Sequence, residues 1–215
     1  MAFEFRTVDS ELLIDAPIIS VRRDTVTMPG GETAIREVVE HFGAVAVVAF
    51  DGEKIALVHQ FRQSAGRRLY ELPAGLLDFA NEDPLDCAAR ELQEEAGLEA
   101  GSWGLLVDLI TSPGFCDEAV RVYLATDLRA VDRPDPEEEE ADMTLRWVAL
   151  DEAVAMVMRG EVSNSIAIAG IMTAAEAVRI GRTRPVGDAF ELRPTALAHR
   201  RQAEGFTGDM KKRHG

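Results

Sequence analysis

The chain has 215 residues, of which 47% are apolar, and it carries a formal charge of −15 at pH 7. A chain of this length and composition can bury a substantial core, so we expect one large domain with at most a small appendage. The acidic charge argues against nonspecific binding to nucleic acid or to an anionic membrane surface, because both need clustered Lys and Arg. An anionic small-molecule ligand would need a cation to help it bind.

The cysteines and the N-terminus give no sign of export. Cys87 and Cys116 lie in no CxxC pattern and have no His at zinc spacing, so neither a zinc cluster nor a disulfide framework is indicated. No basic segment followed by an apolar one opens the chain, and the small-apolar stretch from Ile166 to Ala175 is too short to span a bilayer. We expect a soluble cytoplasmic protein with reduced thiols.

Strand-forming residues dominate the first part of the chain. Between Ile14 and His41, β-rich segments surround the turn Pro29-Gly30-Gly31, which predicts a small N-terminal sheet. Two apolar runs follow, at Ala44–Phe50 and Lys54–Phe61, joined by Asp51-Gly52-Glu53. Because Asp-Gly is a strong hairpin signal, we expect these runs to form a hairpin of core strands.

A helix from Pro84 to Ala96 is the most clearly marked element. Asp83 can cap its start, Pro84 suits its first position, and Gly97 can close its end. Later elements are strands at Gly104–Ile110, Val120–Ala125 and Thr144–Ala149, a Pro- and Glu-rich loop at Arg133–Asp142, and helices at Asp151–Arg159 and about Ser163–Arg179. The mixture predicts an α+β fold. The basic end, Arg193–Gly215, is expected to have a mobile last stretch.

The most informative segment runs from Arg90 to Leu98. On the predicted helix, Glu91, Glu94 and Glu95 share one face. Like charges at this spacing cost a helix roughly 0.2–0.5 kcal/mol per pair, whereas a divalent cation would make the same cluster favourable. Carboxylates together with water suit Mg²⁺ or Mn²⁺. Taken alone, however, such a pattern is more often a solvated acidic face.

The surrounding residues favour the metal site. Gly75, Glu82 and the run from Arg90 to Leu98 resemble the Nudix box, a loop-helix-loop signature of nucleoside diphosphate hydrolases. Six residues separate Gly75 from Glu82, one more than the usual spacing, whereas the helical part matches at every defining position.

A narrower resemblance is to ADP-ribose pyrophosphatases, closest to the actinobacterial members. It covers most of the chain, and Pro113, sixteen residues after Gly97, is the mark that separates this branch from dinucleoside polyphosphate hydrolases. The other residues that carry it are Gln60-Phe61-Arg62, Glu71 to Asp78, Ser112 to Phe115, Glu139 to Met143 and Asn164 to Ala167.

This resemblance implies the architecture. It predicts a Nudix α/β/α sandwich with an additional N-terminal antiparallel β-sheet that is exchanged across a homodimer, so that each active site is built from both subunits. We therefore expect an N-terminal sheet in residues 1–42, a catalytic domain in residues 43–192 and a basic tail in residues 193–215.

The resemblance also implies a metal site that holds Mg²⁺ or Mn²⁺, with two or three ions. Glu91 and Glu95 would be direct ligands, joined by the backbone carbonyl of Ala74 and helped by Glu94. Glu82 is a weaker candidate because of the extra residue before it.

Other site residues have two interpretations each. Arg90 either pairs with Glu94 one turn along the helix or orients the catalytic carboxylates. Arg62, at the end of an apolar strand, is either an ordinary surface residue or, by resemblance, holds a phosphate, since a guanidinium fork matches phosphate oxygens. The segment Pro113-Gly114-Phe115 would form a wall of the ribose or adenine site, although Pro-Gly is also a common turn. Arg67 and Arg68 are expected to be solvated loop residues.

The acidic run Glu137–Glu140 is by default a solvated loop, but by resemblance Glu140 would be the general base. The implied reaction is attack of a metal-activated water on the diphosphate of ADP-ribose, releasing AMP and ribose 5-phosphate. One alternative is hydrolysis of another nucleoside diphosphate derivative, such as a sugar nucleotide or NADH. Another is a non-catalytic ADP-ribose-sensing module, which would tend to lose box glutamates or to carry a DNA-binding domain; the chain shows neither.

Overall fold

A computed structural model describes residues 3–133 and 143–212 of the chain. In chain order its elements are β1 (Thr7–Asp15), β2 (Ser20–Thr27), β3 (Thr33–Glu40), β4 (Ala44–Ala49), β5 (Lys54–Arg62), β6 (Arg67–Glu71), β7 (Ala74–Leu76), α1 (Pro84–Ala96), β8 (Leu98–Ile110), β9 (Ala119–Ala130), β10 (Thr144–Ala149), α2 (Leu150–Met158), α3 (Ser165–Ile180) and α4 (Ala196–Ala203).

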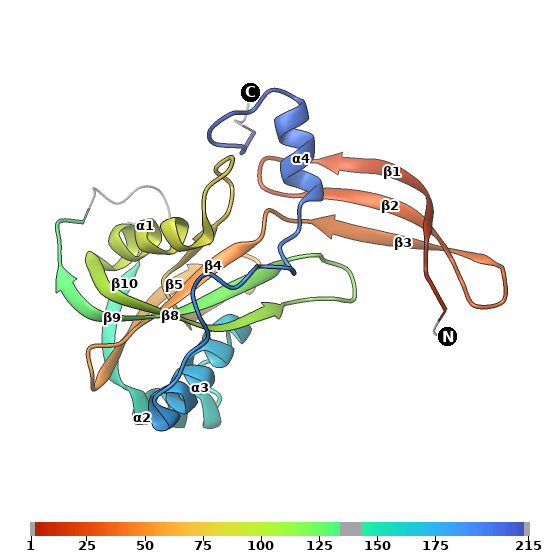
Figure 1. Cartoon of the computed structure of the whole chain (residues 1–215). Helices are drawn as coiled ribbons and strands as arrows, with labels where there is room; N and C mark the ends of the chain where they lie inside the picture. The colour runs from red at the N-terminus through yellow and green to blue at the C-terminus, as the bar shows by residue number, and fades with distance from the viewer. Residues whose placement is uncertain (1–2, 134–142, 213–215) are drawn as a thin grey trace.

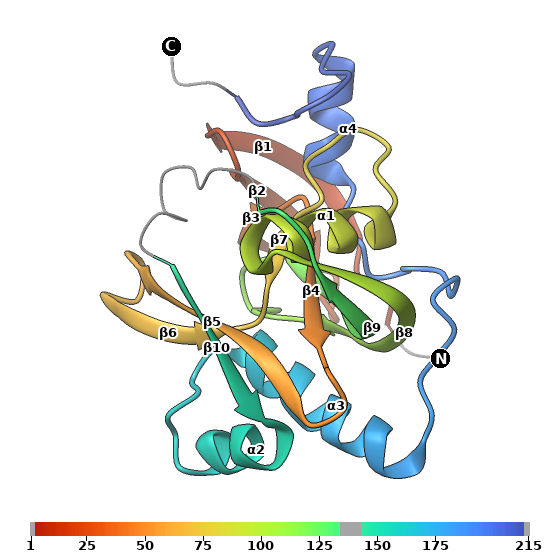
Figure 2. The same cartoon turned by 90° about the vertical axis from the view of Figure 1, so that its left-hand side faces the viewer.

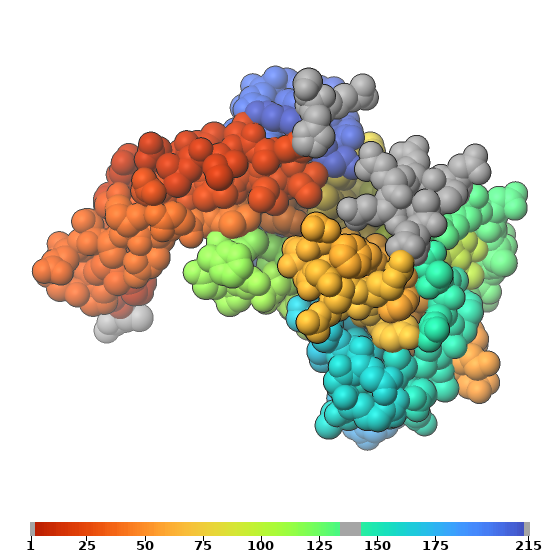
Figure 3. Space-filling model, turned by 180° about the vertical axis from the view of Figure 1, so that it is seen from behind, coloured from red at the N-terminus to blue at the C-terminus, as the bar shows by residue number. Residues whose placement is uncertain are grey.

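The first three strands form a separate antiparallel sheet in the order β1-β2-β3, as predicted. This sheet, called the arm sheet below, projects from the rest of the molecule (Figures 1 and 3). Helix α4 packs against the end of the arm sheet that is nearest the body, where its arginines contact Asp15 and Glu40. The arm sheet begins at Thr7, earlier than the predicted Ile14. From Thr7 to Ile14 every residue of β1 is exposed, so this edge strand has no core of its own on either face.

Two further sheets make up the body of the molecule: a mixed sheet in the order β7-β4-β9-β8 and an antiparallel sheet in the order β10-β5-β6 (Figure 2). The predicted pairing of β4 with β5 was wrong. The Asp51-Gly52 turn does form, with the Asp51 amide donating to the Lys54 carbonyl at 3.0 Å, but only the bridge Phe50–Ile55 joins the two strands. Beyond it they separate, since β4 pairs in parallel with β9 and β5 pairs with β10 and β6.

Helices cover both faces of these sheets, which confirms the predicted α/β/α arrangement. Successive side chains of β4 alternate between the two cores. Val45 and Val47 pack toward α1 in one cluster, whereas Ala46 and Val48 pack toward α2 and α3 in the other. Every residue of β4 is therefore buried, which explains its uninterrupted apolar sequence.

Three elements of the structure were not predicted from the sequence. The strands β6 and β7 are short and polar or glycine-containing, and α4 lies in the segment expected to be a tail. Arg67 and Arg68 were assigned to a loop, but they begin β6 and stay exposed there. The predicted later helices correspond to α2 and α3. Across the part of the chain that is described, no helix is long and apolar enough to cross a membrane.

Candidate active site

Helix α1 positions the acidic cluster, and local capping sets its limits. The Asp83 carboxylate accepts a hydrogen bond from the Leu85 amide at 2.8 Å, and Gly97 ends the helix with a φ of 64°. The helix runs from Pro84 to Ala96, as predicted. Its buried face carries Glu91 and Glu95, which are only 9% and 8% exposed.

The backbone of β7 lies directly against both carboxylates. The Ala74 amide donates to Glu95 Oε2 at 2.9 Å. A Cβ atom on Gly75 would lie only 2.0 Å from the carboxyl carbon of Glu91, so a side chain cannot be accommodated there while Glu91 keeps its position. The contact with Glu91 gives a physical reason for glycine at the first position of the box. Together the two contacts bring Ala74, Glu91 and Glu95 close to one another.

Arg90 contacts three of the neighbouring acids at once. Its guanidinium lies 3.0 Å from Glu82, 2.6 Å from Glu91 and 3.0 Å from Glu94. The i,i+4 pair with Glu94 and the contact with Glu91 therefore occur in the same side chain, so the two interpretations of Arg90 do not exclude each other. Glu82 reaches Arg90 despite the extra residue in the loop before the helix.

Among the described residues, Glu82, Glu91 and Glu94 place more negative charge around Arg90 than its single guanidinium balances. Burial is the largest effect on Glu91 and raises its pKa to about 7, against the opposing effect of Arg90. Glu94 and Asp78 raise the pKa of Glu91 further by charge repulsion. A group of carboxylates in this condition favours a bound cation.

Arg62 is held by a buried network on the adjoining sheet. Its Nη2 atom donates to Glu71 Oε2 at 2.8 Å, and Glu71 is only 5% exposed. Gln60 and Asn164 each donate to the same carboxylate at 3.0 Å. The sequence motifs contained Glu71 and Asn164 but assigned them no role, because nothing in a linear motif shows that β6 and the start of α3 meet at one carboxylate.

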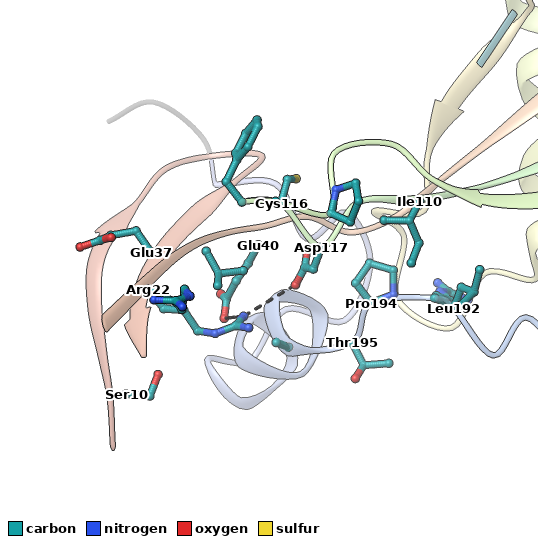
Figure 4. Close-up of a pocket in the computed structure, with 17 residues that line it drawn as sticks. Ser10, Arg22, Glu37, Glu40, Ile110, Cys116, Asp117, Leu192, Pro194 and Thr195 are labelled. Atoms are coloured by element: carbon teal, nitrogen blue, oxygen red, sulfur yellow. Dashed lines mark hydrogen bonds and ion pairs between the residues drawn. The ribbon is translucent and has the colours of Figure 1, made fainter. Parts of the chain in front are cut away.

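The segment Pro113-Gly114-Phe115 lines a different part of the molecule, a pocket of about 870 Å³ between the N-terminal sheet and the body (Figure 4). The Val39 amide of β3 donates to the Phe115 carbonyl at 2.7 Å, which ties this segment to the sheet. Figure 4 shows Arg22, Glu40 and Asp117 turned toward one another. The Arg22 guanidinium lies 2.8 Å from the Glu40 carboxylate.

The lining of this pocket among the described residues does not include Glu91 or Glu95. Arg193 connects the two regions, because it lines the pocket and also donates to the backbone carbonyl of Glu82 at 3.3 Å. Glu140 lies outside the described residues, so its place relative to either region is not part of the structure.

Comparison with known proteins identifies two regions of the chain. Residues 40–166 match the model of the NUDIX domain, and residues 5–39 match the nucleoside diphosphate sugar hydrolase N-terminal domain. An ADP-ribose pyrophosphatase of Mycobacterium tuberculosis is 56% identical over 92% of this chain and 97% of its own.

Some more distant relatives have other names. A methanol dehydrogenase activator of Bacillus methanolicus is 36% identical over 76% of this chain and 88% of its own. A GDP-mannose pyrophosphatase of Citrobacter koseri is 31% identical over 59% of this chain and 70% of its own. A crystal structure of an ADP compounds hydrolase superposes with a TM-score of 0.73 at 16% identity, covering 84% of this chain and 97% of that one.

Proposed function

Because the chain belongs to the Nudix family, we propose that it hydrolyses the diphosphate of ADP-ribose to AMP and ribose 5-phosphate with a divalent cation, Mg²⁺ or Mn²⁺. The observation that carries the proposal is the contact of β7 with the two buried carboxylates of α1. The close similarity to the mycobacterial ADP-ribose pyrophosphatase supports this substrate over others.

The residues present fit a magnesium site. The buried carboxylates of Glu91 and Glu95 lie against the backbone of β7 and offer oxygen donors side by side. Such oxygen donors suit Mg²⁺, which proteins usually bind through one or two carboxylates while it keeps several waters and contacts substrate phosphates. In our proposal Glu91, Glu95 and the carbonyl of Ala74 hold the ions, with Glu94 and Glu82 in supporting places. When bound, the ions neutralise the diphosphate and lower the pKa of water.

Other side chains would position the substrate and move the proton. Arg90 keeps Glu91 and Glu94 oriented, and Arg62, fixed by Glu71, would hold a phosphate through its guanidinium fork. Glu140 is proposed as the base that takes a proton from the attacking water. The reaction then needs no covalent bond to the protein.

The pocket beside Pro113-Gly114-Phe115 is the proposed place for the ribose or adenine group. The arm sheet is proposed to complete the site across a homodimer, which would also cover the exposed apolar residues of β1, such as Leu12 and Ile14. Replacing Leu12 by Glu should give a folded monomer of lower activity in light scattering and rate measurements. A monomer that kept full activity would remove the dimer from the proposal.

The substrate is tested with a panel of ADP-ribose, ADP-glucose, GDP-mannose, NADH and diadenosine compounds, each with and without Mg²⁺. We expect ADP-ribose to give the highest kcat/KM and metal removal to abolish turnover. A higher value for a sugar nucleotide or NADH would support the alternative Nudix substrate, and binding of ADP-ribose without turnover would support a sensing module.

We also propose that the protein acts in the cytoplasm, in keeping with its free cysteines, Cys87 and Cys116.

A further inference from the structure

The segment after α4 turns back and pairs with the loop between β7 and α1 (Figure 1). Phe79 and Asp209 form an antiparallel bridge. On either side of it, the Ala80 amide donates to the Gly208 carbonyl at 2.9 Å, and the Met210 amide donates to the Asp78 carbonyl at 2.8 Å. The loop that precedes the catalytic helix therefore has a strand-like partner from the far end of the chain.

Apolar packing fixes this segment in place. Met210 is 1% exposed and lies in a small core with Phe42 and Leu197, each fully buried. Ala80 of the loop and Phe206 pack against the same core. The segment is thus anchored independently of the ion pairs that it makes.

An ion pair joins the same two segments. The Lys211 ammonium lies 3.0 Å from Asp78 Oδ2, and the Asp78 side chain is only 4% exposed. A carboxylate buried to this degree costs free energy when it has no cation beside it, and the Lys211 ammonium offsets that cost. The next residue, Lys212, lies elsewhere, against Asp15 of the N-terminal sheet and 3.4 Å from Glu204.

The paired loop is continuous with the backbone that touches the acidic cluster. Asp78 follows β7, whose Gly75 lies against Glu91. The extra residue between Gly75 and Glu82 lies in this loop, where Asn81 adopts a left-handed φ of 65°.

We propose that the segment Thr207–Lys211 is part of the active site and that Lys211 is a positioning residue for the reaction. Lys211 holds Asp78, and through it the lengthened loop and β7, in the geometry that sets Glu91. This inference rests on the proposed hydrolase function for its kinetic part only.

The test compares Lys211→Met with Lys212→Met, a matched change at the neighbouring lysine. Lys211→Met should lower kcat by about 10-fold to 100-fold, the range expected when catalytic groups shift by up to an ångström, and should leave KM within about threefold. Lys211→Arg should restore most of the rate. The double variant Asp78→Asn with Lys211→Met should also recover, because the buried charge that needs Lys211 is then gone.

Amide hydrogen exchange of Ala80 and Met210 gives a second measurement that needs neither substrate nor metal. Exchange should be faster in Lys211→Met and unchanged in Lys212→Met. Equal exchange and equal kcat in both variants would overturn the proposal, and so would a loss of rate that the double variant does not recover. If the wild-type protein left ADP-ribose intact, the exchange result would still decide whether Lys211 holds the loop.

Discussion

The contact between Gly75 and Glu91 makes a sharp prediction for the variant Gly75→Ala. The added methyl would meet the Glu91 carboxyl carbon and Oε1 at 2.0 Å, whereas ordinary van der Waals contact begins at 3.4 Å. The atoms must therefore separate by about 1.4 Å, the difference between these two distances. Since the obstacle is the end of a flexible side chain, Glu91 can swing away, but it then leaves β7 and its 2.6 Å contact with Arg90.

The catalytic loss should exceed the loss of stability. Forcing an extra methyl into a packed site typically costs about 1–3 kcal/mol, and the freedom of Glu91 to move places this variant at the lower end. A misplacement of about 1 Å at a catalytic group can lower a rate about 100-fold. We therefore expect kcat for ADP-ribose to fall about 100-fold while the free energy of unfolding falls by about 1 kcal/mol.

Initial rates at saturating substrate and Mg²⁺, together with urea unfolding curves, measure both quantities. Gly187→Ala is the control, because a Cβ there meets no atom within 4 Å. If Gly75→Ala kept kcat within threefold of the wild type while folding normally, the contact with Glu91 would have no catalytic role. If Gly75→Ala were strongly destabilised but each folded molecule kept the wild-type kcat, the expectation that the catalytic loss exceeds the loss of stability would also be contradicted.

Three other predictions follow from the charges. Glu91→Gln and Glu95→Gln should each lower kcat by more than about 100-fold in steady-state assays without lowering the urea midpoint, since one repelling carboxylate is removed. Glu140→Gln should lower kcat by about 100-fold to 10,000-fold with metal affinity by calorimetry unchanged, whereas Glu139→Gln should lose far less. Burial raises the pKa of Asp15, but hydrogen bonds from Lys212, Ser20 and Arg201 outweigh it and hold that pKa at about 2. The ionised Asp15 therefore stabilises the folded state fully above its pKa in the unfolded chain, about 3.9, and this stabilisation is lost as the pH falls toward 2. Asp15→Asn should flatten the dependence of the free energy of unfolding on pH between these two values, as measured by urea unfolding.

Local signals in the sequence were sufficient to predict the limits of helix α1. Asp83, Pro84 and Gly97 determine where α1 starts and stops through contacts within a few residues, so its limits could be predicted. The spacing of Glu91 and Glu95 likewise placed both carboxylates on one face. The turn at Asp51-Gly52 was also local and was predicted, but which strands pair beyond it depends on β9, far along the chain.

The parts of the site that were missed depend on contacts between distant segments. Glu71 meets Asn164 only after β6 and α3 pack together, and Gly75 meets Glu91 only after β7 lies along α1. Neither contact has a signal in hydrophobic periodicity. The ion pair of Lys211 with Asp78 was missed for the same reason, since a basic residue near Gly205 and Gly208 is typical of a solvated tail.

The bridge between Phe79 and Asp209 has a consequence for how the protein reaches its active form. Contacts between residues so distant in sequence form late, because the entropy of closing the loop is paid before the contact stabilises the chain. The sheets of the body can assemble from shorter-range pairings, such as β8 with β9, while the loop before α1 is still free. During refolding from denaturant, secondary structure should therefore return before enzymatic rate, and the interval between the two should report the docking of Thr207–Lys211.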